Sequence, residues 1–119
     1  MGRVATIDHN GTSILFLDFS KISTAETPAV IQEAISVIRS SPPSSLRIMS
    51  DFTDANYDKQ TTADVKAFSA GNKPYVKASA VVGITGLKKI IFTGIISATG
   101  RKMNLCNTRE EAKDWLITQ

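Results

Sequence analysis

Residues 72–89 decide the fold, and they read Asn-Lys-Pro-Tyr-Val-Lys-Ala-Ser-Ala-Val-Val-Gly-Ile-Thr-Gly-Leu-Lys-Lys. Val76 to Val82 is a short apolar run bounded by turn residues, which is typical of a strand buried on both faces of a parallel sheet. Pro74 disfavours helix at the residue before it, so we expect a preceding helix to stop there. Gly83 and Gly86 bound a short loop that leads into an apolar helix. The stretch therefore predicts a buried strand, a tight crossover and a helix.

The loop between the two glycines resembles a phosphate-binding loop only superficially. A strand followed by glycine and a helix start can bind an anion, because the first turn of a helix has free N–H groups. Here two residues separate the glycines and Leu87 follows the second, whereas a P-loop has four residues between its glycines and then Lys and Ser or Thr. A plain crossover is the simpler interpretation.

Outward from this stretch, turn residues and hydrophobic periodicity predict the other elements. Asn10-Gly11 lies between two strand-like runs and predicts a hairpin with a type I′ turn. Further strands are expected at 46–51 and 103–106, the latter at an edge. Helices are expected up to about Arg39, from Thr61 or Thr62 to Gly71, over 87–99, and after Thr108, which begins a capping box. The order ββαβαβαβα predicts an α/β fold, with a mostly parallel five-stranded sheet, an N-terminal hairpin and four helices.

Three of these helices have a predicted inward stripe of apolar residues. For the first helix it is Val30, Ile31, Ala34, Val37 and Ile38. For the helix over 87–99 it is Leu87, Ile90, Ile91, Gly94, Ile95 and Ala98. For the last helix it is Ala112, Trp115 and Leu116.

Composition restricts the class of protein. The 119 residues have 42% apolar content and a net charge of +3, which predict one globular domain over 1–119. The basic residues are scattered, so we expect no nucleic-acid partner. No apolar run reaches the roughly 20 residues of a membrane span, and residues 1–9 lack the apolar core of a signal peptide, so we expect neither. A single cysteine, Cys106, is interpreted as a small buried hydrophobe in a cytoplasmic protein. The only histidine, His9, is interpreted as a solvated strand-end residue.

The chain also resembles a known family, the STAS/SEC14-like (SpoIIAA-like) family of small, mostly uncharacterised bacterial proteins. The similarity rests on residues 14–20, 72–83, 86–90 and 111–116. It implies the anti-sigma-factor-antagonist α/β fold, which agrees with the predicted order of elements. It also implies a protein-binding, regulatory role, because the better-studied relatives are protein-binding switches. Another branch of the family binds lipids in a larger fold, and this chain looks too short for such a cavity.

In those switches a serine is phosphorylated within an Asp-Ser-Ser-Gly motif that lies between the third strand and the next helix. The corresponding residues here are Asp58-Lys59-Gln60-Thr61, without the serine and the glycine. The resemblance therefore leaves Thr61 or Thr62 as the phosphoacceptor candidates. Both are equally well explained as helix caps.

A candidate ligand site lies at the carboxyl ends of the strands, where α/β sheets bind their ligands. Its candidate residues are Asp18, Ser20, Asp51, Thr53, Asp54, Tyr57 and Thr85. Two or three carboxylates at one rim could hold Mg²⁺, which prefers oxygen ligands. The alternative is that Asp18 and Asp51 accept hydrogen bonds from loop N–H groups as turn residues.

A candidate partner surface lies on the helix over 87–99, opposite its predicted core stripe. It comprises Lys88, Lys89, Phe92 and Ile96. Two large apolar residues on a wet face predict a homodimer or protein-partner contact, unless another part of the same chain covers them. The first hypothesis is therefore a non-enzymatic domain that binds a protein partner or itself. The second is a domain that binds a small ligand or Mg²⁺ at the rim. The sequence predicts no catalytic residues, no cofactor and no dedicated metal ligands.

Overall fold

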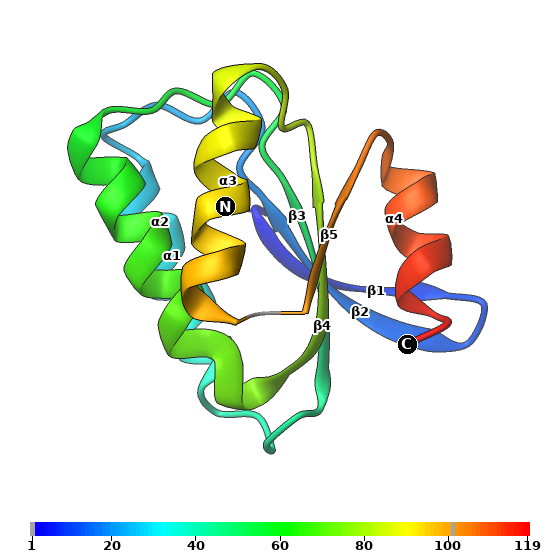
Figure 1. The fold of residues 1–119 in the computed structure, drawn as a ribbon. Coiled ribbons are helices and arrows are strands. Elements are labelled where there is room, and N and C mark those ends of the chain that lie inside the picture. The colour runs from blue at the N-terminus through cyan, green and yellow to red at the C-terminus, as the bar shows by residue number, and fades with distance from the viewer. Residues whose placement is uncertain (1, 101) are drawn as a thin grey trace.

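A computed structural model describes residues 2–100 and 102–119, with the side chain of Leu87 outside the described part. The elements follow the predicted order (Figure 1). They are β1 (Val4–His9), β2 (Thr12–Asp18), α1 (Thr27–Ile38), β3 (Leu46–Asp51), α2 (Lys59–Asn72), the 3₁₀ turn η1 (Lys73–Tyr75), β4 (Val76–Val82), α3 (Leu87–Thr99), β5 (Met103–Cys106) and α4 (Arg109–Leu116).

The strands form one mixed sheet in the order β1-β2-β3-β4-β5. β1 and β2 pair antiparallel, and each later neighbour pairs parallel. Asn10 and Gly11 both have positive φ, 52° and 83°, as the predicted type I′ turn requires. β5 lies at the edge, and the fold class predicted from the sequence is confirmed.

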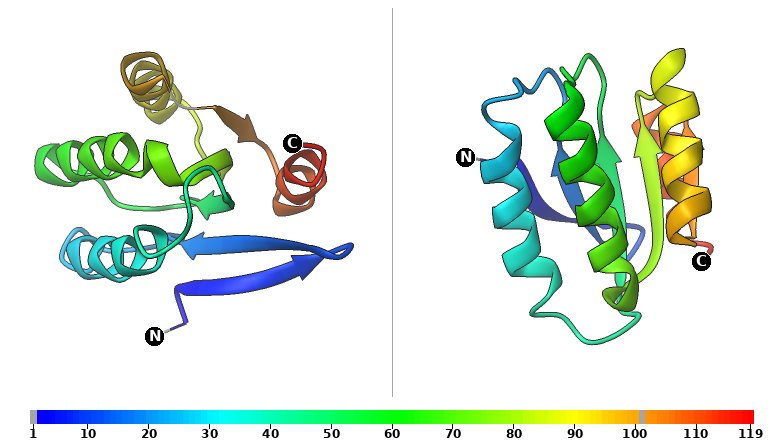
Figure 2. Two further views of the ribbon diagram at one scale, coloured as in Figure 1. Left: turned by 90° about the horizontal axis from the view of Figure 1, so that it is seen from below. Right: turned by 60° about the vertical axis from the view of Figure 1, so that its left-hand side comes forward.

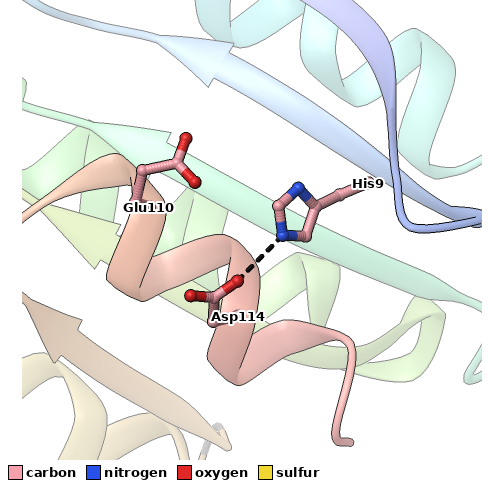
Figure 3. A group of neighbouring side chains, drawn as sticks. All are labelled: His9, Glu110 and Asp114. Atoms are coloured by element: carbon pink, nitrogen blue, oxygen red, sulfur yellow. Dashed lines mark hydrogen bonds and ion pairs between the residues drawn. The ribbon is translucent and has the colours of Figure 1, made fainter.

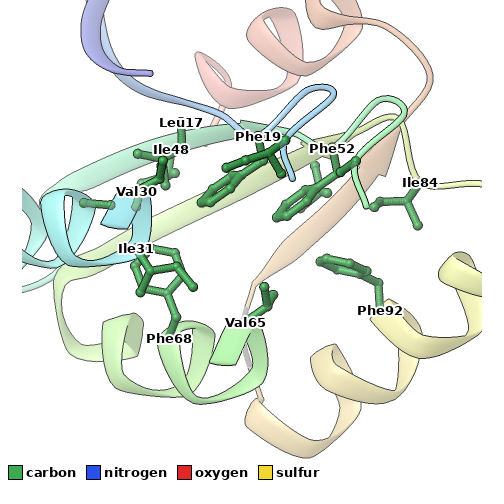
Figure 4. Packing of buried hydrophobic residues seen from close by; sticks show 14 of the residues in the cluster. Leu17, Phe19, Val30, Ile31, Ile48, Phe52, Val65, Phe68, Ile84 and Phe92 are labelled. Carbon is green, nitrogen blue, oxygen red and sulfur yellow. The ribbon is translucent and has the colours of Figure 1, made fainter. Parts of the chain in front are cut away.

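Helices cover the two faces of the sheet unequally. α1, α2 and α3 lie side by side on one face, and α4 lies alone on the other (Figure 2). Two apolar clusters follow from this arrangement, one under the three helices and a smaller one under α4. The larger cluster contains Phe19, Phe52, Phe68 and Phe92 (Figure 4). In the smaller cluster Ala112 and Leu116 are fully buried, and Trp115 is only partly buried beside them.

The structure corrects several predicted helix details. In α1, Val37 is 41% exposed instead of inward, and Ile35 packs against the core in its place. α2 begins earlier than predicted, because Asp58 and not Thr61 or Thr62 is its N-cap. The helix ends one residue beyond Gly71, before the Lys73-Pro74 turn.

The inward face of α3 is rotated relative to the prediction. Ile90 is 70% exposed and Ile91 is 42% exposed, whereas Phe92 is only 4% exposed. Of the predicted stripe, Ile95 is buried, and Gly94 and Ala98 are exposed; the side chain of Leu87 lies outside the described residues. The prediction was wrong because α3 is apolar on most sides, so its periodicity does not define which side faces the sheet.

Candidate functional site

Two matching turns form the rim at the carboxyl ends of β2 and β3. Asp18 and Asp51 are direct neighbours in the parallel register, and each is followed by a phenylalanine and a hydroxyl residue. Asp18 Oδ1 accepts hydrogen bonds from the Ser20 N–H at 2.9 Å and from its hydroxyl at 2.5 Å. Asp51 Oδ1 accepts the equivalent pair from Thr53, at 2.9 and 2.6 Å. The turn-residue interpretation of both aspartates is therefore what the geometry supports.

The phenylalanines of the two turns point into the core and stack on each other. The Phe19 and Phe52 rings lie 4.8 Å apart with an interplanar angle of 1°. Phe92 of α3 packs on Phe52 at 5.1 Å (Figure 4), and Tyr57 lies 6.1 Å from Phe52 on the other side. These aromatic contacts join the rim to α3, and they explain why Phe92 faces inward.

Arg109, at the start of α4, completes the rim and was not among the predicted residues. Its Nε donates to Asp51 Oδ2 at 2.7 Å, and its Nη2 lies 3.8 Å from Asp18 Oδ1. The guanidinium also lies over the Phe16 ring, 4.7 Å from its centroid. Burial alone would raise the pKa of Asp51, but the hydrogen bonds from Thr53 and Arg109 outweigh it and hold that pKa below its usual range. The Arg109 cation thus offsets one of the two negative charges that the sequence offers to Mg²⁺.

The other predicted rim residues do not converge on this pair. Asp54 and Thr85 are exposed loop residues, and Asp54 has a left-handed backbone with φ of 54°. Tyr57 packs among the core aromatics, and burial raises the pKa of its phenol. Gly83 approaches Thr53 so closely that a Cβ would lie 2.4 Å from the Thr53 nitrogen. The loop after β4 therefore packs against the β3 turn.

The predicted partner surface is only partly at the surface. Phe92 is buried, so its assignment to the wet face was wrong; the sheet and the loop after β3 cover it. Ile96 is half-buried. Lys88 folds back, donates from Nζ to the Ala55 carbonyl at 2.8 Å and lies over the Tyr57 ring. Lys89 is exposed. The apolar residues that do reach the surface are Ile90 and Ile91.

The two phosphoacceptor candidates differ in access. Thr61 is 3% exposed, and its hydroxyl accepts from the Asp58 N–H at 2.8 Å within the capping box of α2. Phosphorylation there would break the cap. Thr62 is half-buried beside Tyr57 and Lys88, where a small apolar cavity of about 60 Å³ opens between α2 and α3. Neither hydroxyl is therefore fully exposed to a modifying enzyme.

His9 differs from its predicted solvated state. Its side chain is 18% exposed, and Nε2 lies 2.9 Å from Asp114 Oδ1 on α4 (Figure 3). The hairpin curves over the α4 face of the sheet, so the two residues meet although 105 positions separate them in the sequence. No local sequence pattern around His9 predicts this contact, because the contact depends on how far the hairpin twists.

Comparisons with known proteins define the class of the fold. No family model and no curated protein sequence matches the chain. Among solved structures, it is similar to an uncharacterised protein of the DUF3478 family from Shewanella loihica PV-4, described as having a SpoIIAA-like fold. The TM-score is 0.75 at 13% identity over 95% of this chain and 91% of that one.

A second solved structure agrees with the first. It is an anti-sigma-factor antagonist (STAS) domain protein from Planctomyces limnophilus, with a TM-score of 0.65 and 8% identity over 96% of this chain and 97% of that one. The chain therefore has the SpoIIAA-like (STAS) fold. At such low identities the likeness shows the fold alone. Among the described residues, no helix is both long and apolar enough to span a bilayer.

Proposed function

We propose that this protein is a non-enzymatic interaction domain that binds a second copy of itself through the outer face of α3. This outer face comprises Ile90, Ile91, Gly94 and Ala98, with the exposed, uncharged Thr93 and Ser97 among them. The observation that supports the proposal is that α3 carries no charge from Ile90 to Thr99, while its two isoleucines are 70% and 42% exposed. A helix that is apolar on most sides is normally covered on most sides. α3 has only α2 beside it in its layer (Figure 2).

The shape of this face favours a second copy as its occupant. The bulky residues Ile90 and Ile91 lie in the first half of α3. The exposed residues of the second half are small, and a Cβ added to Gly94 would meet nothing within 4 Å. In a two-fold antiparallel pair the bulky half of each helix would lie on the flat half of the other. An isologous contact of this kind needs one surface that is complementary to itself.

The size of the face predicts the strength of the contact. Stable complexes bury roughly 800 Å² per partner, and a 13-residue helix is about 20 Å long, so one side of it offers less than that area. We therefore expect a weak dimer whose population rises with protein concentration.

Cys106 is buried, and His9, Ser20 and Thr53 already have partners, which is why we propose no enzymatic activity. Cys106 is buried, and burial, followed by the charge of Glu111, raises the pKa of its thiol. His9 is paired with Asp114 instead of with a hydroxyl or thiol. The Ser20 and Thr53 hydroxyls donate to the aspartates of their own turns.

The test is the native mass of the protein as a function of concentration, by light scattering or analytical ultracentrifugation. Wild type is expected to shift from monomer toward dimer, and Ile90→Asp to remain a monomer at every concentration. Val37→Asp is the control, because Val37 is also an exposed apolar residue, 41% against 70% for Ile90, but lies on α1; it should dimerise like wild type. A wild type that stays monomeric at millimolar concentration, or an Ile90→Asp variant that still dimerises, would overturn the proposal.

A further inference from the structure

Three potential metal ligands meet on the face of the molecule opposite α3. His9 comes from the end of β1, and Glu110 and Asp114 lie one turn apart on α4 (Figure 3). One ligand atom from each residue lies within 4.8 Å of the other two. Residues four apart on a helix share a face, so both carboxylates face the hairpin that carries the imidazole.

We infer that these three side chains form a binding site for a divalent transition-metal ion such as Zn²⁺. One imidazole nitrogen with two carboxylate oxygens is a ligand set that zinc accepts, and three protein ligands leave a fourth position for water. A mixed nitrogen and oxygen set favours Zn²⁺ over Mg²⁺, which prefers oxygen alone. This inference is independent of self-association through α3.

The distances between the ligand atoms fit such an ion after small movements. His9 Nε2 and Asp114 Oδ1 are 2.9 Å apart. Two ligands at roughly 2.0–2.1 Å from a tetrahedral zinc ion lie about 3.3 Å apart, so this pair needs to open by only a few tenths of an ångström. Glu110 must swing further, and its side chain is 72% exposed and has room to do so.

The scaffold around the site confines the imidazole and fixes the helix that carries the two carboxylates, whose side chains are themselves 68% and 72% exposed. The His9 ring is 18% exposed and is therefore confined by its neighbours. α4 is fixed at its start by the Arg109–Asp51 pair and at its end by Arg47, whose Nε donates to the Leu116 carbonyl at 3.2 Å. Ligands that are already positioned lose less freedom when they bind an ion.

The charges around the site both favour and oppose cation binding. With neutral His9, the two carboxylates carry a charge of −2, which a divalent ion would neutralise. Lys113 opposes binding, because its Nζ lies 3.3 Å from Glu110 Oε1. Glu110 must release that exposed ion pair, which is weak in water, before it can reach the metal.

The test is isothermal titration of the purified full chain with ZnCl₂ and, separately, with MgCl₂. We expect one Zn²⁺ per chain, no measurable Mg²⁺ binding and a higher melting temperature with Zn²⁺. His9→Gln should abolish binding, and Glu110→Gln should weaken it about tenfold or more, as loss of a ligand does. Because Glu110 is exposed, its variant should fold normally even if the His9 variant does not.

Two control variants make the result specific to this site. Glu33→Gln removes an exposed carboxylate of α1, and Cys106→Ser removes the only thiol; both should bind Zn²⁺ like wild type. The absence of wild-type binding at 1 mM Zn²⁺ would overturn the inference. It would also fail if Glu110→Gln bound as tightly as wild type, or if Cys106→Ser lost binding, because zinc would then be held elsewhere.

Discussion

Helices α3 and α4 follow neighbouring strands of the same sheet, yet different forces hold them. α4 is eight residues long, and besides the buried Ala112 and Leu116 it has several polar contacts: Thr108 caps it, Arg109 reaches Asp51 and Asp114 reaches His9. α3 is thirteen residues long, and no side chain caps its start. The aromatic packing of Phe92 and one lysine that bonds to a backbone carbonyl attach it to the rest of the molecule.

This difference has a consequence for what each helix can do. Hydrogen bonds and ion pairs have preferred directions, so they define one position for α4 and keep its outer side charged. Apart from the Lys88 hydrogen bond, apolar packing restricts α3 by shape, and residues 90–99 of α3 carry no charge. The proposed ion site lies on the α4 side, and the proposed contact with a second copy lies on the α3 side.

The largest expected effect is the difference in stability cost between substitutions on the buried and on the exposed side of α3. Phe92→Ala should lower the free energy of unfolding by about 3–5 kcal/mol, the usual cost of removing a buried phenylalanine. Ile90→Ala, two residues earlier, should change it by no more than about 0.5 kcal/mol, as surface substitutions do. Urea denaturation at a concentration where the protein is monomeric measures both. If both substitutions lowered the unfolding free energy equally, Phe92 would not be the buried side of α3.

The second effect comes from the attachment of α4. Asp51→Asn removes the charge that Arg109 pairs with, and we expect a loss of about 2 kcal/mol, less than the ~3–5 kcal/mol of a fully buried pair because Arg109 is 43% exposed. Asp54→Asn is the matched control, since it is exposed and asparagine tolerates its positive φ.

The same two variants also test the rim as a magnesium site. If Mg²⁺ raised the melting temperature of wild type and of Asp54→Asn, but not that of Asp51→Asn, the rim would bind the ion despite Arg109. We expect no Mg²⁺-dependent change in any of the three proteins, because the Asp51 carboxylate already accepts hydrogen bonds on both of its oxygens.

Most of the fold could be predicted from the sequence because its signals are local. Asn10-Gly11 defines the hairpin through backbone φ alone, and the apolar run 76–82 defines β4 by its own pattern. The pairing of the two rim turns could also have been predicted from the sequence. Asp18-Phe19-Ser20 and Asp51-Phe52-Thr53 are two copies of one pattern at two strand ends, which a search for repeated tripeptides would have linked.

The start of α2 was missed although its Asp58–Thr61 capping box is local, but the pairing of Arg109 and the orientation of α3 depend on contacts between distant residues. Arg109 lies 58 positions from Asp51, and nothing beside either residue points to the other. The orientation of α3 follows from Phe52 and Tyr57, which are not part of that helix. When a helix has apolar residues on most of its sides, the residues that pack against it determine which side faces the core.

The third effect is the acid sensitivity of the α4 attachment. The pKa of Asp51 is lower in the folded protein than its ordinary value, so its contribution is complete above the unfolded pKa of about 3.9. That contribution is lost as the pH falls through the lower folded value. The unfolding free energy of wild type should therefore drop below about pH 4, and that of Asp51→Asn should drop less. Some slope should remain, because the Thr61 N–H also lowers the pKa of Asp58. Identical acid profiles would contradict the role given to Asp51.

The smallest expected effect returns to the α3 side, where polar groups matter least. Tyr57 Oη is buried and has no hydrogen-bond partner among the described residues, while its ring packs against Phe52, Phe92 and Lys88. Tyr57→Phe keeps those ring contacts and removes the unsatisfied hydroxyl, so it should stabilise the protein by about 1 kcal/mol. Tyr75→Phe, at a half-buried tyrosine, is the control and should be nearly neutral in the same urea titration. If Tyr57→Phe stabilises the protein and Asp51→Asn destabilises it, the contrast between the two helices is established. If Tyr57→Phe destabilised the protein, the α3 side would also depend on a polar contact, and the contrast would fail.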